Sequence, residues 1–271
     1  MSALPEADTI TTWESETGTL AQADCLDWMR GLVKESIQLI LIDPPFFTGK
    51  RQTGGGESPP SYADSWGGEK GSYLDWLLER ADLMRELLHP TGSFVIHLDW
   101  HAAHAVKVAL DALFGEENFQ NEIIWYYQTG GASRNRFSRK HDTLLWYTRS
   151  EEWVFHPERV QIPRTEKAMH RAQNPKGARI SSSDTHKYPE DVISIPALNP
   201  MSNERTGYPT QKPIELMEIF VKALTDPGDC VADCFCGSGT TLVAADQLGR
   251  QWLGCDSSAE AIEICRRRLL I

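Results

Sequence analysis

The sequence lacks long hydrophobic runs. No stretch of 18 or more consecutive residues is apolar, so we expect no membrane-spanning helix. The first 18 residues are polar and acidic, without the basic start and the apolar stretch of a signal peptide. A cytoplasmic protein is therefore expected. The 271 residues, 41% of them hydrophobic, are enough for one large domain or for a domain with an insert.

Metal-ligand spacings are also missing. Six cysteines are present, but none forms a CxxC pair, and the Cys234-x-Cys236 spacing is tighter than that of common zinc sites. Without a secretory context we expect no disulfides, and we interpret the cysteines as small apolar side chains. His97, His101 and His104 have helix-like spacing, but we interpret them as ordinary loop and helix histidines. We predict no metal site.

Positive charge is scarce overall but concentrated in the middle of the chain. The net charge of −11 argues against a nucleic-acid partner. However, residues 134–187 contain 12 Lys and Arg against 6 Asp and Glu, so this segment carries +6 and the remainder carries −17. From charge alone, a polyanion-binding insert and an ordinary solvated basic face are equally good interpretations. The densest part of the segment is Arg134, Arg136, Arg139 and Lys140.

Hydrophobic patterns predict alternating strands and helices, and hence an α/β sheet. The near-continuous apolar run at 37–42 is typical of a buried parallel strand. Residues 48–71, with seven glycines and two prolines, predict a long functional loop. Residues 150–199 are polar, basic and poor in periodicity, which indicates a different module or a large insert. We predict strands at 20–24, 37–42, 94–98, 122–127, 143–147, 230–233 and 251–255, and helices at 73–88, 102–114, 214–224, 240–248 and 259–270.

A glycine-rich turn near the C-terminus predicts a nucleoside-cofactor site. A predicted strand ends at Asp233, and Phe-Cys-Gly-Ser-Gly-Thr-Thr follows at 235–241, before a predicted helix. Glycines let the backbone turn sharply and approach a ligand, and the free N–H groups of a helix start favour an anionic group. Nineteen residues after Gly237, the next strand ends at Asp256, a spacing that suits a carboxylate binding ribose hydroxyls. The alternative is a tight strand-to-helix turn without a ligand, since the spacing is neither GxGxxG nor that of a P-loop.

The tetrapeptide Asp43-Pro44-Pro45-Phe46 follows the strand at 37–42, where open α/β sheets place their chemistry. An exocyclic amino group is a poor nucleophile, because its lone pair is delocalised into the ring. An enzyme can accept hydrogen bonds from both N–H groups, here with the Asp43 carboxylate and the rigidly directed carbonyl of Pro44. Phe46 offers a flat face for a base rotated out of the duplex. The alternative is an Asp-Pro turn and a core phenylalanine.

Together, the two motifs resemble the DNA amino-methyltransferases, which use S-adenosylmethionine (AdoMet). The tetrapeptide precedes the glycine turn, with the basic segment between them, and this permuted order is similar to that of the beta class. Tyr-Pro-Thr-Gln-Lys-Pro at 208–213 also matches the element of this class that comes just before the cofactor loop. The resemblance implies a Rossmann-like, mostly parallel sheet with helices on both faces plus an inserted target-recognition region. It divides the chain into a catalytic half at 1–130, the insert at 131–200 and an AdoMet-binding half at 201–271.

The resemblance also implies roles for individual residues. Thr210, Gln211 and Lys212 approach the AdoMet carboxylate, Asp256 holds the ribose, and Asp24 contacts the adenine end, although Ala23 stands where glycine is usual before that acid. The other expected cofactor-binding residues are Asp233, Phe235, Gly237, Ser238, Gly239 and Thr240. The expected catalytic residues are Asp43, Pro44, Pro45 and Phe46, and the expected DNA-binding residues are Arg134, Arg136, Arg139 and Lys140.

We therefore expect a site-specific methyltransferase that acts on a flipped base of double-stranded DNA. Asp43 at the first motif position favours adenine N6 over cytosine N4, and Phe46 does not decide between them. The alternatives are methylation of RNA or protein amides, a DNA-binding module without catalysis, and a nicotinamide oxidoreductase. The permuted order argues against amide methylation, and the intact acids argue against a module without catalysis. The absent GxGxxG argues against an oxidoreductase. A homodimer and a cognate restriction enzyme are the further partners that the resemblance suggests.

Overall fold

A nine-stranded mixed sheet forms the centre of the computed structural model, which describes residues 10–48, 50–53, 61–64, 70–128, 131–172, 185–199 and 201–271. The strand order is β1-β2-β13-β12-β3-β6-β8-β7-β11. The strands are β1 (Thr11–Glu14), β2 (Gly18–Gln22), β3 (Ile37–Ile42), β6 (Leu88–Leu98), β7 (Phe119–Tyr126), β8 (His141–Thr148), β11 (Val192–Ser194), β12 (Cys230–Asp233) and β13 (Gln251–Asp256).

The middle of the sheet is parallel and buried. Strands β2, β13, β12, β3 and β6 are consecutive parallel neighbours, whereas β8 runs antiparallel to both β6 and β7. Every residue of β3 is buried, which explains its continuous apolar run. From β12 the chain continues to β13, and from β3 it continues to β6 on the other side, so the topological switch point lies between β12 and β3. Open α/β sheets bind ligands at such a point, beyond the carboxyl ends of the strands.

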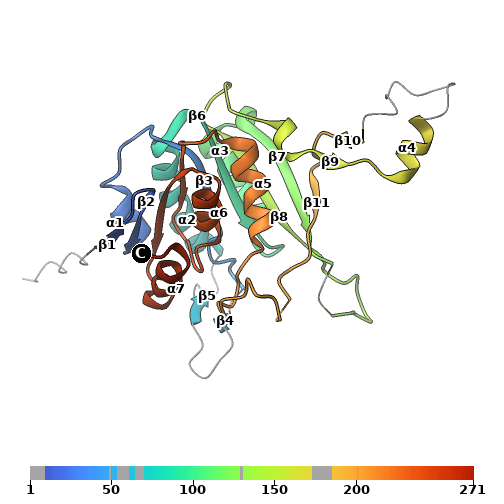
Figure 1. The fold of residues 1–271 in the computed structure, drawn as a ribbon. Coiled ribbons are helices and arrows are strands. Elements are labelled where there is room, and N and C mark those ends of the chain that lie inside the picture. The colour runs from blue at the N-terminus through green and yellow to red at the C-terminus, as the bar shows by residue number, and fades with distance from the viewer. Residues whose placement is uncertain are drawn as a thin grey trace, which may run out of the picture.

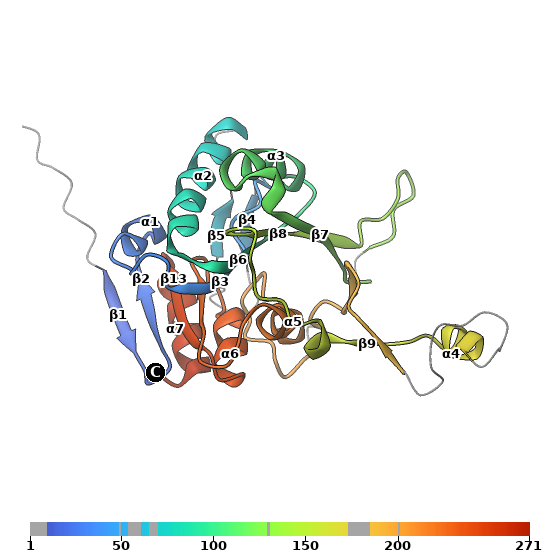
Figure 2. The ribbon, with the colours of Figure 1, turned by 90° about the horizontal axis from the view of Figure 1, so that it is seen from above.

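Helices cover both faces of the sheet (Figure 2). One face carries α1 (Cys25–Met29), α2 (Lys70–Leu87) and α3 (Ala103–Phe114), and the other carries α5 (Ile214–Leu224), α6 (Thr240–Gln247) and α7 (Ala259–Leu269). Each set packs on its own apolar cluster, with Leu77 and Val106 in one and Phe220 and Leu242 in the other. Among the helices of the described ranges, none is long and apolar enough to cross a membrane.

Most of the predicted elements are confirmed. Strands β3 and β12 and helix α5 have the predicted bounds, and the strands predicted at 122–127 and 143–147 correspond to β7 and β8, which pair antiparallel. The elements β1 and α1 were not predicted, because four and five residues are too few for a periodic pattern. The long-loop prediction at 48–71 is incomplete, since β4 (Lys50–Thr53) pairs antiparallel with β5 (Ser61–Asp64) and α2 begins at Lys70. Residues 49, 54–60 and 65–69 lie outside the described part.

The segment at 131–200, expected as one insert, contributes to the main sheet. Strand β8 lies between β6 and β7, and β11 pairs with the outer edge of β7. A second part extends away from the sheet beyond β11 (Figures 1 and 2). This arm contains β9 (Ile162–Pro163), α4 (Glu166–Ala172) and β10 (His186–Lys187), whereas η2 (Pro157–Val160), which precedes them, packs against α5. Residues 129–130, 173–184 and 200 lie outside the described part.

Candidate active site

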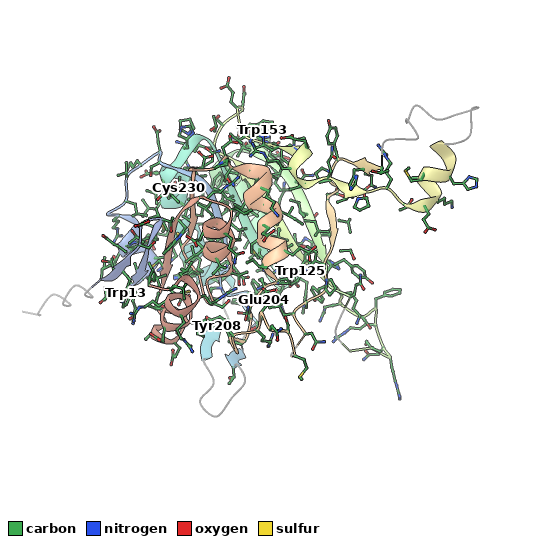
Figure 3. The ribbon with its side chains drawn as sticks, viewed as in Figure 1. Trp13, Trp125, Trp153, Glu204, Tyr208 and Cys230 are labelled. Carbon is green, nitrogen blue, oxygen red and sulfur yellow. The ribbon has the colours of Figure 1, made fainter. Side chains whose placement is uncertain are left out.

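Four neighbouring parallel strands each deliver an aspartate to the same edge of the sheet. Asp256 and Asp233 are the last residues of β13 and β12, Asp43 follows β3, and Asp24 comes two residues after β2. In Figure 3, Tyr208 lies at this carboxyl edge, whereas Cys230, the first residue of β12, lies at the opposite end. The edge therefore concentrates acidic groups where the fold positions a ligand.

A cavity of about 300 Å³ lies at this edge. The predicted site residues that line it are Asp24, Asp43, Pro45, Thr210, Lys212, Asp233, Phe235, Gly237, Ser238, Thr240 and Asp256. The predicted residues that are not part of its lining are Pro44, Phe46, Gln211, Gly239, Arg134, Arg136, Arg139 and Lys140. The structure thus brings the two sequence motifs, which lie almost 200 residues apart, to one pocket at the ends of the neighbouring strands β3 and β12.

The turn between β12 and α6 requires glycine at two positions. Gly237 has a φ of +50° and Gly239 a φ of +75°, and both values lie in the left-handed region that favours glycine. A Cβ atom on Gly239 would lie 2.8 Å from Sγ of Cys265, and one on Gly237 would lie 3.0 Å from the Tyr208 ring. The turn can therefore pack against α7 and the 208–213 segment only because side chains are absent.

Hydrogen bonds from later elements fix the glycine turn. Oδ2 of Asp256 accepts the backbone N–H of Gly237 at 2.8 Å, and Oδ1 accepts the N–H of Ser258 at 2.8 Å. From α7, Arg268 donates to the Ser238 carbonyl at 2.7 Å and to the Thr240 hydroxyl at 3.1 Å. Arg268 was not predicted, since its partners lie about 30 residues away and no local pattern marks it.

Among the described residues, neither Asp233, which is buried, nor Asp256, which is half-buried, forms an ion pair with a cationic side chain. Burial raises the pKa of Asp233 to about 7, and the nearby Asp43 and Asp256 carboxylates add to this effect against hydrogen bonds from Phe235 and Thr241. Burial also raises the pKa of Asp256, although backbone N–H groups oppose it. This part of the pocket therefore favours a cationic or hydroxyl-bearing ligand, which would stabilise the ionised acids.

Within the predicted cofactor segment 210–212, Gln211 and Lys212 contact different parts of the structure. Gln211 is buried and turns away from the cavity, because its amide accepts from Thr206 and donates to the Glu204 carbonyl at 2.7 Å. Lys212 is also buried, and its ammonium group donates to Oδ2 of Asp43 and, at 3.1 Å, to the Thr210 carbonyl. Gln211 therefore shapes the segment, whereas Lys212 links the segment to the tetrapeptide.

Contacts from α2, β6 and Lys212 hold the tetrapeptide at the carboxyl end of β3. Tyr73 of α2 donates its hydroxyl to the Pro45 carbonyl at 2.8 Å. The ring of Phe46 packs edge-on against His97, with 5.2 Å between the ring centroids. Oδ1 of Asp43 lies 2.7 Å from Nδ1 of His97, while Oδ2 receives Lys212. Burial favours the neutral acid, but Lys212 and His97 outweigh it, so the pKa of Asp43 lies below its ordinary value.

The interpretation of His97 as an ordinary loop or helix histidine was wrong. It lies in β6, is 1% exposed, and contacts Asp43. The register pairs Ile42 with Ile96, so the next residues of both strands, Asp43 and His97, come side by side. A lone histidine inside the apolar run at 94–98 was the sequence signal, but its meaning depended on this pairing. Within the described ranges, no group of three or more His, Cys, Asp or Glu side chains has the geometry to hold a metal ion.

On the α2 side, Trp76 lines the pocket and Arg80 contacts Trp76, and the sequence did not single out either residue. Arg80 is buried and binds Asp24 through both carboxylate oxygens, at 2.9 and 2.7 Å. Its guanidinium also lies 4.4 Å from the ring centroid of Trp76, which in turn contacts the Phe235 ring. Asp24 additionally caps α1 through the N–H of Leu26. Asp24 thus has structural partners in addition to its place in the cavity lining.

The predicted DNA-binding cluster occupies the connection between β7 and β8. Because β8 runs antiparallel to both β6 and β7, β7 points in the same direction as the parallel strands, and this connection lies at the carboxyl edge of the sheet (Figure 1). Arg134, Arg136 and Arg139 are exposed, and Phe137 between them is 98% exposed. The guanidinium of Arg139 stacks on Trp100, which follows β6, at 3.5 Å from the ring centroid. The cationic connection is therefore anchored near His97 and Asp43.

Comparison with known proteins agrees with this architecture. The Type II methyltransferase M1.MboII of Moraxella bovis is 26% identical over 268 residues, covering 91% of this chain and 94% of that protein. The DNA adenine methyltransferase YhdJ of Escherichia coli (strain K12) is 24% identical over 261 residues, covering 96% and 85%. Among solved structures, the cytosine-N4-specific PvuII DNA methyltransferase shares the fold, with a TM-score of 0.71, 20% identity and coverage of 95% of this chain and 88% of that one. The family model for DNA methylases of the N6/N4 type matches residues 37–267, so the chain belongs to this DNA methylase family.

Proposed function

We propose that the protein transfers the methyl group of AdoMet to the exocyclic amino group of a base flipped out of double-stranded DNA, with adenine N6 as the target. The observation that carries the proposal is the position of Asp43, which faces the same cavity as the glycine turn. In the reaction, the amino nitrogen attacks the methyl carbon, the carbon–sulfur bond breaks, and S-adenosylhomocysteine and one proton leave. A carboxylate that accepts an amino hydrogen bond favours this attack.

The cofactor side of the pocket suits the chemistry of AdoMet. Asp256 at the end of β13 can receive the ribose hydroxyls, and the N–H groups at the start of α6 favour the anionic end of a ligand. Asp233 lines the same cavity, where an ionised carboxylate attracts the positively charged donor. Lys212 can reach the AdoMet carboxylate from its present position against Asp43. AdoMet would thus lie with its sulfonium between the glycine turn and the tetrapeptide.

In this proposal, the β7–β8 connection forms the surface of the protein that binds DNA. Three exposed arginines can neutralise phosphates, and Arg139 ties the connection to the rim of the pocket. Phe137 offers an apolar ring to the stacked bases, an arrangement that proteins use to support an unstacked duplex. The negative charge of the rest of the chain would hold DNA to this edge, because the other surfaces repel it.

Adenine is favoured over cytosine because of the acid at the first position of the tetrapeptide. Asp43 is held ionised by Lys212 and His97, so it acts as a hydrogen-bond acceptor for an amino group. The relatives include an adenine methyltransferase, and the structural neighbours include a cytosine-N4 enzyme. The base identity therefore rests on Asp43 alone.

Incubation with methyl-labelled AdoMet and double-stranded DNA tests the proposal. Digestion to nucleosides and mass spectrometry should show N6-methyladenine. N4-methylcytosine would correct the base, and label in RNA or protein but not in DNA would overturn the substrate. Analytical ultracentrifugation of the purified protein tests the expected homodimer. A cognate restriction enzyme is tested by expressing the product of a neighbouring gene and asking whether it cleaves unmethylated DNA but not methylated DNA. Localisation in the cytoplasm, where DNA is accessible, is part of the same proposal.

A further inference from the structure

His97 is buried between two carboxylates from neighbouring strands. Its Nδ1 forms a 2.7 Å hydrogen bond with Oδ1 of Asp43, and its buried Nε2 lies 3.3 Å from Oδ2 of Asp142, within ion-pair distance but without hydrogen-bond geometry. The His97 side chain is 1% exposed, while those of Asp43 and Asp142 are 22% and 17% exposed. Three adjacent strands, β3, β6 and β8, thus place an acid, an imidazole and a second acid in one row.

Aromatic rings fix the plane of the imidazole. Phe46 packs edge-on at 5.2 Å between centroids, and Trp125 of β7 packs edge-on from the other direction at 5.7 Å. Trp125 is itself held, because its indole N–H donates to the Ile195 carbonyl at 2.8 Å. The imidazole therefore has little freedom to turn away from Asp43, and a histidine that only filled space would need none of these polar contacts.

We infer that His97 is a positioning residue for the methyl transfer, which keeps the Asp43 carboxylate in one orientation while Asp142 keeps the imidazole in place. Oδ1 of Asp43 accepts the Nδ1–H of His97 throughout the cycle, and Oδ2 is the oxygen that receives the amino group of the base. This inference rests on the proposed function. It resembles the general arrangement in which one carboxylate orients a histidine that serves a reacting group.

Lys212 also holds the Asp43 carboxylate, through Oδ2, the oxygen that the base would use. Its ammonium group binds Oδ2 of Asp43 from the segment before α5, opposite His97. The amino group of a base must take this position, and the carboxylate of bound AdoMet is a suitable new partner for Lys212. His97 then becomes the contact that still prevents rotation of the Asp43 carboxylate. The need for a second anchor follows from this exchange.

The charges around the row determine its response to pH. Asp43 faces His97 of β6, Lys212 before α5 and Asp233 of β12, and Asp142 also contacts Tyr127. Burial and Lys212 favour a neutral imidazole, but the two carboxylates outweigh them, so the pKa of His97 lies above its ordinary value. Without His97, Asp43 would remain buried but would lose one of the two partners that stabilise its charge. The pKa of Asp43 would then rise.

Steady-state kinetics of four variants test the inference. His97→Leu removes both polar contacts, His97→Asn can keep a donor near the Nδ1 position, and Asp142→Asn weakens the second anchor. His104→Asn is the matched control, because His104 is exposed on α3. We expect His97→Leu to lower kcat about 100-fold with an unchanged KM for AdoMet, as for a misplacement on the order of 1 Å. His97→Asn should recover part of this loss, and the control should match the wild type.

The pH profile of kcat at saturating AdoMet separates positioning from packing, because saturation removes the pH dependence of AdoMet binding. In His97→Leu the acidic limb should move to higher pH, because Asp43 becomes protonated at a higher pH. A packing role would lower the rate equally at every pH, so an unmoved limb, or Leu and Asn variants of equal activity, would overturn the inference. If His97→Leu does not fold, His97→Asn and Asp142→Asn carry the same test.

Nitrogen NMR of the wild-type histidine rings gives a test that does not require activity. We expect Nδ1 of His97 to carry a proton at pH 7, and an unprotonated Nδ1 would overturn the inference. If the wild type transfers no methyl group to DNA, the proposed function fails, whereas an active wild type with indifferent His97 variants removes only the positioning role.

Discussion

Oδ2 of Asp256 accepts a 2.8 Å hydrogen bond from the backbone N–H of Gly237, which joins the end of β13 to the glycine turn after β12. The same carboxylate accepts the N–H of Ser258, so it fixes the turn and the start of α7 together. The proposed ribose-binding acid and the proposed binding loop are therefore one unit. A change at Asp256 should affect the whole cofactor side of the pocket.

We predict that Asp256→Asn weakens AdoMet binding about 10- to 100-fold, since hydrogen bonds to charged groups contribute about 1.5–3 kcal/mol. The amide would present a donor where the carboxylate accepts two backbone N–H groups. Isothermal titration calorimetry gives the dissociation constant. Asp27→Asn, at an exposed position of α1, is the control and should bind AdoMet normally. Equal affinity of the Asp256 variant and the wild type would contradict the assignment.

AdoMet affinity should fall as the pH decreases through about 7. Burial raises the pKa of Asp233 to about 7, so below this pH the acid is increasingly neutral and loses its attraction for the cationic donor. Because the pKa of Asp233 is raised, the affinity for AdoMet is highest above this pKa, where the acid is ionised, and declines below it. AdoMet dissociation constants measured between pH 5.5 and 8.5, roughly one and a half units on either side of this value, should show the decline in the wild type. The Asp233→Asn variant should lack it, and an identical pH dependence would exclude Asp233 as the cause.

The elements that the sequence predicted well are those with local signals. The Ile37–Ile42 strand was predicted to the residue, because its apolar run is bounded by Asp43 and two prolines. Helix α5 was predicted to the residue as well, since Pro213 precedes it and its apolar residues recur with helical spacing. The turn at 235–241 was predictable for the same reason, because glycine itself marks the backbone conformation.

The parts that could not be predicted depend on pairing between distant segments. His97 and Asp43 are 54 positions apart, and Arg80 and Asp24 are 56 apart. Such contacts follow from strand register and helix docking, which no short pattern contains. The basic segment was also identified by composition alone, so its division between β8, the β7–β8 connection and the arm became visible only in the fold.

Gly239→Ala should lower the stability of the protein more than Gly249→Ala. Both glycines have similar positive φ values, +75° and +72°, so both variants incur a left-handed backbone cost of about 1–2 kcal/mol. Only Gly239 has a neighbour, Sγ of Cys265, at 2.8 Å from the added Cβ. Chemical denaturation gives the free energies of unfolding. Combining Gly239→Ala with Cys265→Ala should recover part of the difference, and equal costs for the two glycines would contradict the close packing.

Replacing Arg134, Arg136 and Arg139 by glutamine should weaken duplex binding and reduce its salt dependence. Each lost phosphate contact lowers the slope of log affinity against log salt by about 0.9. Fluorescence anisotropy at several salt concentrations measures this slope. The control replaces Arg266 and Arg267 of α7, which lie near carboxylates of the same helix rather than on the β7–β8 connection. Unchanged binding by the triple variant would remove the connection from the DNA interface.

Asp43→Asn should lower the rate of methyl transfer at least about 100- to 1000-fold while AdoMet still binds, because the effect of a lost electrostatic contact falls on the transition state. The amide keeps the shape of the side chain but brings an N–H group into a site that must accept amino hydrogens. It also leaves Lys212 without its carboxylate partner, so AdoMet binding should be equal or slightly stronger. Single-turnover transfer of labelled methyl groups measures the rate, and thermal unfolding checks the fold. A rate close to that of the wild type would mean that Asp43 does not contact the reacting amino group.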